Sequence, residues 1–127
     1  MASTTDAIRT TVENYINSVA KGTADDVLAL YAPGATVEDP VGTEPRTTAE
    51  SLREFYGVVE PLTQTAELLT IKIAANNAAF LFRLTTHLGE QDLVMEVIDV
   101  MTFDDDAKIT SMKAYWSQDD MVAVPAS

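Results

Sequence analysis

The chain contains no cysteine and only one histidine, so several kinds of site are disfavoured at the start. Without cysteine there is no disulfide framework and no thiol nucleophile. A single histidine argues against a structural zinc site, and no segment has the ligand spacing of a calcium loop. The sequence therefore predicts no metal site.

Positive charge is also scarce, because eight basic residues stand against 20 acidic ones and the formal net charge is −12. The basic residues are scattered, whereas nucleic acid and anionic membrane surfaces attract proteins through basic patches. No apolar run approaches the ~18 residues of a membrane-spanning helix, and the opening MASTTDAIRT lacks the features of a secretion signal. We therefore expect a cytoplasmic protein that binds neither nucleic acid nor membrane.

The size of the chain suits one ordinary domain, with 127 residues of which 46% are hydrophobic. A domain of this length buries roughly two thirds of its unfolded surface, which leaves room for an enclosed pocket. The sequence contains no internal repeat, linker or low-complexity segment. We expect residues 1–127 to form a single domain.

The first half of the chain has the apolar spacing of three helices. The first is expected to end near Gly22, and its apolar stripe includes Tyr15. The second is short, with an inward face that reaches Tyr31 before a Pro-Gly pair interrupts it. The third buries Phe55 and Tyr56. The expected capping residues are Thr4 or Thr5, then Thr23, then Thr47 with Glu50 as a capping box.

After residue 61 the pattern changes to four β-like segments, roughly 64–74, 78–88, 91–103 and 108–116. The turn signals NN, GE and DDD separate them, and short turns join antiparallel neighbours. A further strand is expected in ATVEDPVG, before the third helix. This order predicts an α+β fold, in which three N-terminal helices pack on a curved, mostly antiparallel sheet that encloses an apolar pocket.

Asp99 occupies a position where the strand pattern calls for an apolar residue. Because side chains alternate along a strand, one face carries Leu93, Met95, Val97, Asp99, Met101 and Phe103. All of these except Asp99 are apolar. An unpartnered carboxylate is costly to bury and usually keeps its proton. Asp99 therefore either has a dedicated partner or is protonated.

Two more polar groups are expected to point inward. Asp39 shares the face of the apolar residues in ATVEDPV, and Tyr15 lies within the stripe of the first helix. Together with Asp99 they suggest one convergent site in a largely apolar cavity. A protonated Asp99 and the Tyr15 phenol would offer two donors to one oxygen, which is an oxyanion hole made of side chains. Ionised Asp39 would be a base, and the set suits proton abstraction next to a carbonyl.

Simpler interpretations remain open for each residue. Asp39 precedes a proline and could bind local backbone amides as part of a turn. Asp99 could pair with Arg83 or a threonine, or its strand could expose that face. Tyr15 could be a buried tyrosine whose hydroxyl is satisfied. The only histidine, His87, is expected at the surface near a strand end.

The segments YAPGATVEDPVG, REFY, VIDVMTFD and MKAYW resemble those of the bacterial steroid Δ-isomerases, the ketosteroid isomerases of the NTF2-like superfamily. The similarity runs from about Tyr15 to Trp116 and implies an NTF2-like cone. Ketosteroid isomerase itself is known to contain an aspartic acid that its apolar site keeps protonated. The resemblance assigns that role to Asp99, the role of oxyanion tyrosine to Tyr15 and the role of general base to Asp39.

The resemblance implies further contacts and a reaction. Tyr31 and Tyr56 would extend a hydrogen-bond network behind Tyr15 and strengthen its donation. The reaction would move the double bond of a 5-ene-3-ketosteroid to the conjugated 4-ene-3-ketone through a dienolate, without a cofactor. Family members are homodimers packed through the sheet, so a homodimer is expected. The positions that wall the family's steroid pocket correspond here to Phe55, Phe80, Phe82, Met112 and Trp116.

Other functions compete with this one. A polyketide cyclase or a dehydratase of the same superfamily would act on a different enolisable ketone, and a dehydratase would need a better-placed base than His87. A hydrolase of the limonene-epoxide type would need an Asp, Arg, Asp relay, for which Arg83 is the inward candidate. A non-catalytic dimerisation domain, or a module that sequesters a small hydrophobic ligand, would have no need for a base beside two acid donors.

Overall fold

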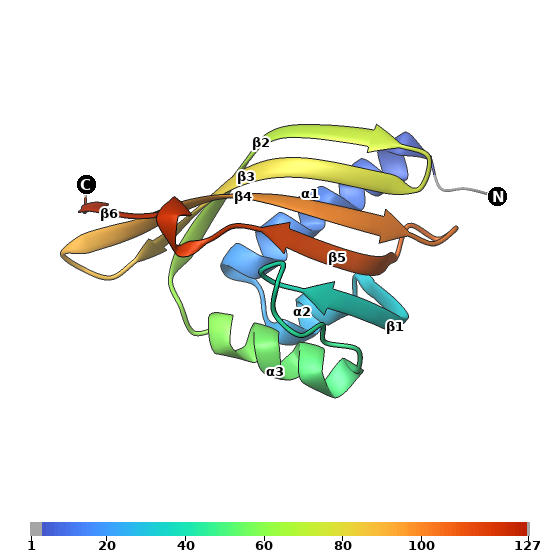
Figure 1. Cartoon of the computed structure of the whole chain (residues 1–127), viewed down its shortest axis with the longest axis horizontal. Coiled ribbons are helices and arrows are strands. Elements are labelled where there is room, and N and C mark those ends of the chain that lie inside the picture. Colours follow the sequence, from blue (N-terminus) through green and yellow to red (C-terminus); the bar gives the residue numbers. More distant parts are fainter. Residues whose placement is uncertain (1–3, 127) are drawn as a thin grey trace.

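The computed structural model describes residues 4–126, which fold around one curved, six-stranded sheet (Figure 1). The expected α+β architecture is confirmed. Residues 1–3 and 127, which the expected domain included, lie outside the described range. The helices and strands are α1 (Thr5–Lys21), α2 (Ala24–Leu28), β1 (Tyr31–Glu38), α3 (Ala49–Val59), β2 (Gln64–Ala74), β3 (Asn77–His87), β4 (Gln91–Phe103), β5 (Ile109–Tyr115), the 3-10 helix η1 (Gln118–Asp120) and β6 (Met121–Pro125).

The sheet is antiparallel except at one edge. Its order is β1-β5-β4-β3-β2, and β1 pairs with β5 in parallel because α3 and three strands intervene between them in the chain. β5 and β6 share one edge of β4, with β5 along residues 98–103 and β6 along residues 91–95. The sequence analysis did not anticipate β6. Its five residues form a strand on the edge that β5 leaves open.

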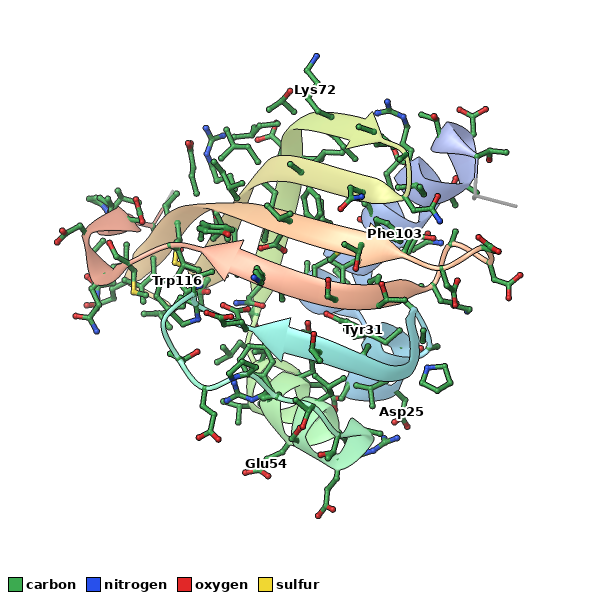
Figure 2. The ribbon with its side chains drawn as sticks, turned by 45° about the vertical axis from the view of Figure 1, so that its right-hand side comes forward. Asp25, Tyr31, Glu54, Lys72, Phe103 and Trp116 are labelled. Atoms are coloured by element: carbon green, nitrogen blue, oxygen red, sulfur yellow. The ribbon has the colours of Figure 1, made fainter. Side chains whose placement is uncertain are left out.

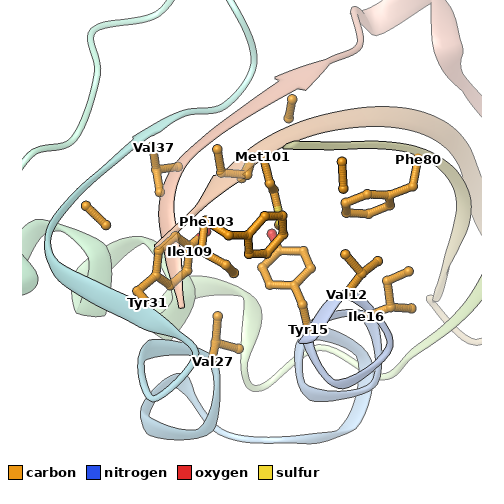
Figure 3. Packing of buried hydrophobic residues seen from close by; sticks show 14 of the residues in the cluster. Val12, Tyr15, Ile16, Val27, Tyr31, Val37, Phe80, Met101, Phe103 and Ile109 are labelled. Atoms are coloured by element: carbon orange, nitrogen blue, oxygen red, sulfur yellow. The ribbon is translucent and has the colours of Figure 1, made fainter. Parts of the chain in front are cut away.

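The helices pack on the concave side of the sheet, as Figure 3 shows from close by. Thr4 caps α1 by accepting a hydrogen bond from the backbone N–H of Ala7. The inward side of α1 carries Ile8, Val12 and Tyr15, which are buried at the expected helical spacing. No helix in the described part of the chain is long and apolar enough to cross a membrane.

The second helix is shorter than expected and does not carry Tyr31. It ends at Leu28, and Tyr31 instead begins β1, where it pairs with Ile109. The backbone N–H of Ile109 donates to the carbonyl of Leu30, so pairing with β5 replaces the next helical turn. Pro33, two residues farther on, has no N–H to continue a helix. β1 therefore starts four residues earlier than the ATVEDPVG pattern predicts.

The third helix is capped one residue later than expected. Its N-cap is Thr48 rather than Thr47, and Ser51 rather than Glu50 completes the capping box. The Thr48 hydroxyl accepts from the Ser51 N–H at 3.1 Å, and the Ser51 hydroxyl oxygen accepts from the Thr48 N–H at 3.2 Å. Thr48 and Ser51 thus satisfy each other's backbone N–H groups, and serine takes the place in the capping box that the sequence analysis gave to glutamate.

Candidate active site

A cavity of about 240 Å³ lies between α1, α3 and the concave face of the sheet. This volume is just below the range of about 300–1,000 Å³ that is usual for small-molecule sites. The three polar residues singled out from the sequence all line it: Tyr15 comes from α1, Asp39 follows the end of β1, and Asp99 lies in β4. The tertiary fold therefore brings together residues that are up to 84 positions apart (99 − 15).

Asp99 is the most deeply buried of the three, with 1% of its surface exposed. Its backbone lies between those of Phe80 on β3 and Ala114 on β5, and its Oδ1 has no hydrogen-bond partner. Burial raises the pKa of this carboxyl well above its usual value, and the nearby charge of Asp39 raises it further. This shift favours the protonated form of the side chain, and a protonated carboxyl can donate one hydrogen bond. The alternative of a pairing with Arg83 is wrong, because Arg83 pairs with Glu67 and Glu96, and no threonine contacts Oδ1.

Asp39 is less enclosed and has a defined partner. The indole Nε1–H of Trp116 donates to Asp39 Oδ1 at 2.7 Å. Burial raises the pKa of Asp39, whereas the hydrogen bond from Trp116 and the charge of Arg46 lower it. The backbone continues from Asp39 into the loop that follows β1, and Figure 2 shows Trp116 just beyond the end of β5, close to that loop. The hydrogen bond and the charge of Arg46 both oppose the effect of burial. Asp39 is therefore a stronger acid than Asp99 and ionises first.

Three tyrosines form a buried chain that leads to the cavity. The hydroxyl oxygens of Tyr31 and Tyr56 are 2.7 Å apart, and those of Tyr56 and Tyr15 are 3.0 Å apart. Burial raises the pKa of all three phenols well above the usual value, so they stay protonated. If each hydroxyl donates toward the cavity, Tyr15 receives a bond from Tyr56 and keeps its own proton for a ligand. Figure 3 shows Tyr15 reaching from α1 toward the sheet.

The five aromatic and methionine positions expected in the pocket wall divide into two groups. Phe55, Phe82 and Trp116 line the cavity. Phe80 and Met112 are not among the lining residues and pack instead in the buried hydrophobic core. The rings of Phe80 and Tyr15 pack edge-on, with centroids 6.5 Å apart, and of these two residues only Tyr15 lines the cavity. The placement of Phe80 and Met112 in the pocket wall is therefore corrected.

The remaining walls were not identified from the sequence. Strand parity was the available signal, since Phe82, Leu84 and Thr86 share one face of β3 and Met95 and Val97 share the matching face of β4. Gln64, at the start of β2, also lines the cavity and had no distinguishing pattern. The additional apolar lining residues are Val19, Val59, Leu62, Leu84, Met95 and Val97.

Arg83 and His87 lie away from the cavity. Arg83 donates to Glu67 at 3.0 Å and to Glu96 at 2.9 Å on an exposed part of the sheet, so its assignment as an inward relay residue is wrong. His87 is partly exposed and its Nδ1 lies 3.0 Å from Oδ1 of Asp92. Within residues 4–126 no group of three or more His, Asp or Glu side chains is arranged to hold a metal ion.

Comparisons with known proteins agree with this architecture. The family model of the SnoaL-like domain matches residues 12–112. A curated steroid Delta-isomerase of Nocardioides simplex is 46% identical over 119 residues, which cover 94% of this chain and 97% of that protein. A solved structure of SalBIII, an epoxide hydrolase/cyclase-like enzyme of pyran ring formation in the polyether salinomycin, matches with a TM-score of 0.85. That match covers 94% of this chain and 97% of SalBIII at 22% sequence identity, and supports the fold alone.

The family model and the curated relative each span most of the chain, and the sheet and helices have the matching fold. The resemblance seen in VEDPVG and VIDVMTFD is confirmed at the level of the family. The chain belongs to the SnoaL-like family, with the NTF2-like fold.

Proposed function

We propose that this protein is a steroid Δ-isomerase, which converts a 5-ene-3-ketosteroid into the conjugated 4-ene-3-ketone. The observation that carries the proposal is the grouping of one ionisable carboxyl, Asp39, with two neutral donors, Tyr15 and Asp99, around one apolar cavity. The 46% identity to a protein named steroid Delta-isomerase supports it independently.

In the first step Asp39 removes a proton from the carbon between the ketone and the isolated double bond. The electron pair of that C–H bond moves into the ring and onto the ketone oxygen, which gives a dienolate. A base works best when its pKa lies near the working pH, and burial raises the pKa of Asp39 in that direction. The hydrogen bond from Trp116 holds the carboxylate in one orientation.

The charge that develops on the ketone oxygen is stabilised by Tyr15 and Asp99. Donors that are already oriented in a water-poor site are each worth about 3 kcal/mol in the transition state. Because Tyr56 and Tyr31 support the hydroxyl of Tyr15, its donation strengthens as the oxygen becomes negative. The substrate and product are neutral, which suits both the apolar walls and the net charge of −12.

In the second step protonated Asp39 returns the same proton two carbons away. The dienolate electrons form the new C–H bond and the conjugated ketone, and Asp39 becomes ionised again. No atom is gained or lost in the cycle. The proposed mechanism needs no redox partner, because the reaction only relocates a double bond and a proton.

We also propose a homodimer that packs through the outward face of the sheet. Ile98 and Tyr115 lie opposite each other on neighbouring strands and are 46% and 47% exposed, and Val122 on β6 is 52% exposed. Apolar side chains gathered on an exposed sheet face are typical of an interface. Ile98→Lys should convert the dimer to a monomer in sedimentation measurements, whereas Val58→Lys on α3 should not. A dimer that survives the first change would contradict this arrangement.

The direct test mixes the purified protein with a 5-ene-3-ketosteroid and follows the ultraviolet absorbance of the conjugated enone. We expect a rapid rise that Asp39→Asn lacks, while steroid still quenches the fluorescence of Trp116, the single tryptophan. Binding without any absorbance change in the native protein would instead favour a non-catalytic ligand-binding module. Absence of both would favour a different enolisable ketone, as in the polyketide cyclases.

A further inference from the structure

The cavity has a second polar end, away from the three catalytic candidates. Gln64 is 6% exposed and lines the cavity, as does Thr86. The Gln64 Nε2–H donates to the Thr86 hydroxyl oxygen at 2.9 Å, across the β2 and β3 register pair that these residues form. This bond fixes the amide and leaves Gln64 Oε1 without a hydrogen-bond partner.

Unpartnered buried polar atoms are uncommon in folded proteins, and each requires an explanation. In the described part of the chain the side chains with such atoms are Gln64, Asn76 and Asp99. Two of them, Gln64 and Asp99, line the same cavity, and Asp99 is the residue that we assign to the ketone oxygen. The shared location suggests that a ligand in the cavity satisfies both groups.

The register of β3 and β4 places these groups at opposite ends of an apolar track. Phe80 pairs with Asp99, then Phe82 pairs with Val97, Leu84 with Met95 and Thr86 with Leu93. The distance from the first pair to the last is six residues, or about 20 Å measured along the strand. The curvature of the sheet shortens the straight path across the cavity. Side chains of the two middle pairs line the cavity between the polar ends.

We propose that Gln64 and Thr86 form a specificity subsite for a hydroxyl group at the end of the steroid remote from the enolised ketone. A hydroxyl can donate to Gln64 Oε1, whereas a ketone offers only an acceptor and a hydrogen atom offers nothing. The proposal rests on the proposed function, since the ketone end of the substrate is assigned to Tyr15 and Asp99. A site with a buried polar group discriminates strongly against a ligand that leaves it unpaired.

The test uses three 4-ene-3-ketosteroids that differ only at the remote end, which carries a hydroxyl, a ketone or a hydrogen atom. These conjugated products cannot be isomerised further, so their dissociation constants follow from the quenching of Trp116 fluorescence at equilibrium. We expect the native protein to bind the hydroxyl ligand about tenfold more tightly than the other two, the ratio expected for one buried neutral hydrogen bond.

Variants then assign the preference to the subsite. Gln64→Leu replaces the amide by an apolar side chain of similar size, and should reduce the tenfold ratio to about one. Thr86→Val removes the group that fixes the amide and should lower the ratio in the same direction. Asn76→Ala is the control, because Asn76 also has a buried, unpartnered amide oxygen but lies in the turn that joins the other ends of β2 and β3. Its ratio should equal that of the native protein.

Several outcomes would overturn the subsite. The subsite is wrong if the native protein binds the hydroxyl and hydrogen ligands with equal affinity. It is also wrong if the native protein binds the ketone ligand more tightly than the hydroxyl ligand. A preference that persists in Gln64→Leu would assign it to another group. Turnover of the 5-ene substrates separates the two proposals. If the protein turns these substrates over but does not prefer the hydroxyl ligand, only the subsite is wrong. If it prefers the hydroxyl ligand but turns no substrate over, only the isomerase function is wrong. If no steroid binds, both are wrong.

Discussion

The indole nitrogen of Trp116 donates a 2.7 Å hydrogen bond to Oδ1 of Asp39, which connects the end of β5 to the residue that follows β1. Both residues line the cavity. The bond restrains the proposed base and stabilises its ionised form, and each effect can be measured separately.

Trp116→Phe should shift the acidic limb of the pH profile of kcat/KM to higher pH. The hydrogen bond from Trp116 lowers the pKa of Asp39, whereas burial raises it. When the hydrogen bond is removed, the effect of burial is less compensated and the pKa rises. We also expect kcat to fall by about tenfold, because the carboxylate is less well oriented. Arg46→Gln should move the limb in the same direction, since the charge of Arg46 also lowers that pKa. A limb that stays in place, or moves to lower pH, would contradict the assignment of Asp39 as the base.

Asp99→Ala should lower kcat by about 10²- to 10³-fold, the usual loss when one oxyanion donor is removed. Asp99→Asn should lose much less, because the amide is neutral, has a similar shape and can still donate a hydrogen bond. Steady-state kinetics with one 5-ene-3-ketosteroid would compare the two variants. Equal losses in the alanine and asparagine variants would mean that Asp99 does not act as a donor.

Asp99→Asn should also change how stability depends on pH. The folded pKa of Asp99 lies well above the usual value of 3.8, so the folded protein holds a proton that the unfolded chain releases. The free energy of unfolding therefore falls as pH rises above about 3.8, and the asparagine variant lacks this loss. Urea unfolding should find the variant more stable than the native protein at pH 7, with a difference that shrinks toward pH 4. A pH-independent difference would show that Asp99 is ionised in the folded protein.

The tyrosine chain predicts a graded loss of activity. Tyr56→Phe removes both of the hydrogen bonds in the chain, whereas Tyr31→Phe removes only the bond farther from the cavity. We expect Tyr15→Phe to lower kcat most, Tyr56→Phe by about tenfold or less, and Tyr31→Phe least. If Tyr31→Phe lost more activity than Tyr56→Phe, in variants of equal thermal stability, the proposed order of the chain from Tyr31 through Tyr56 to Tyr15 would be wrong.

The sequence by itself determined that Asp99 and Tyr15 point inward. Alternation along residues 93–103 places Asp99 among apolar neighbours, because a strand has a period of two, and helical spacing places Tyr15 on the buried stripe of α1. The same local rules predicted the α+β fold and most of the strand positions. Short-range geometry is sufficient for these conclusions, since the direction of a side chain follows from its own backbone.

Only the tertiary structure decided which inward side chains meet the cavity and which are covered. Phe80 and Phe82 have the same parity on β3, yet Phe82 lines the cavity, whereas Phe80 does not and packs against Tyr15 from α1. The contact between Trp116 and Asp39 joins residues 77 positions apart (116 − 39), and that between Gln64 and Thr86 depends on the pairing of β2 with β3. Local patterns specify direction, whereas contact depends on the packing of elements that are distant in the chain, and that packing is a property of the whole fold.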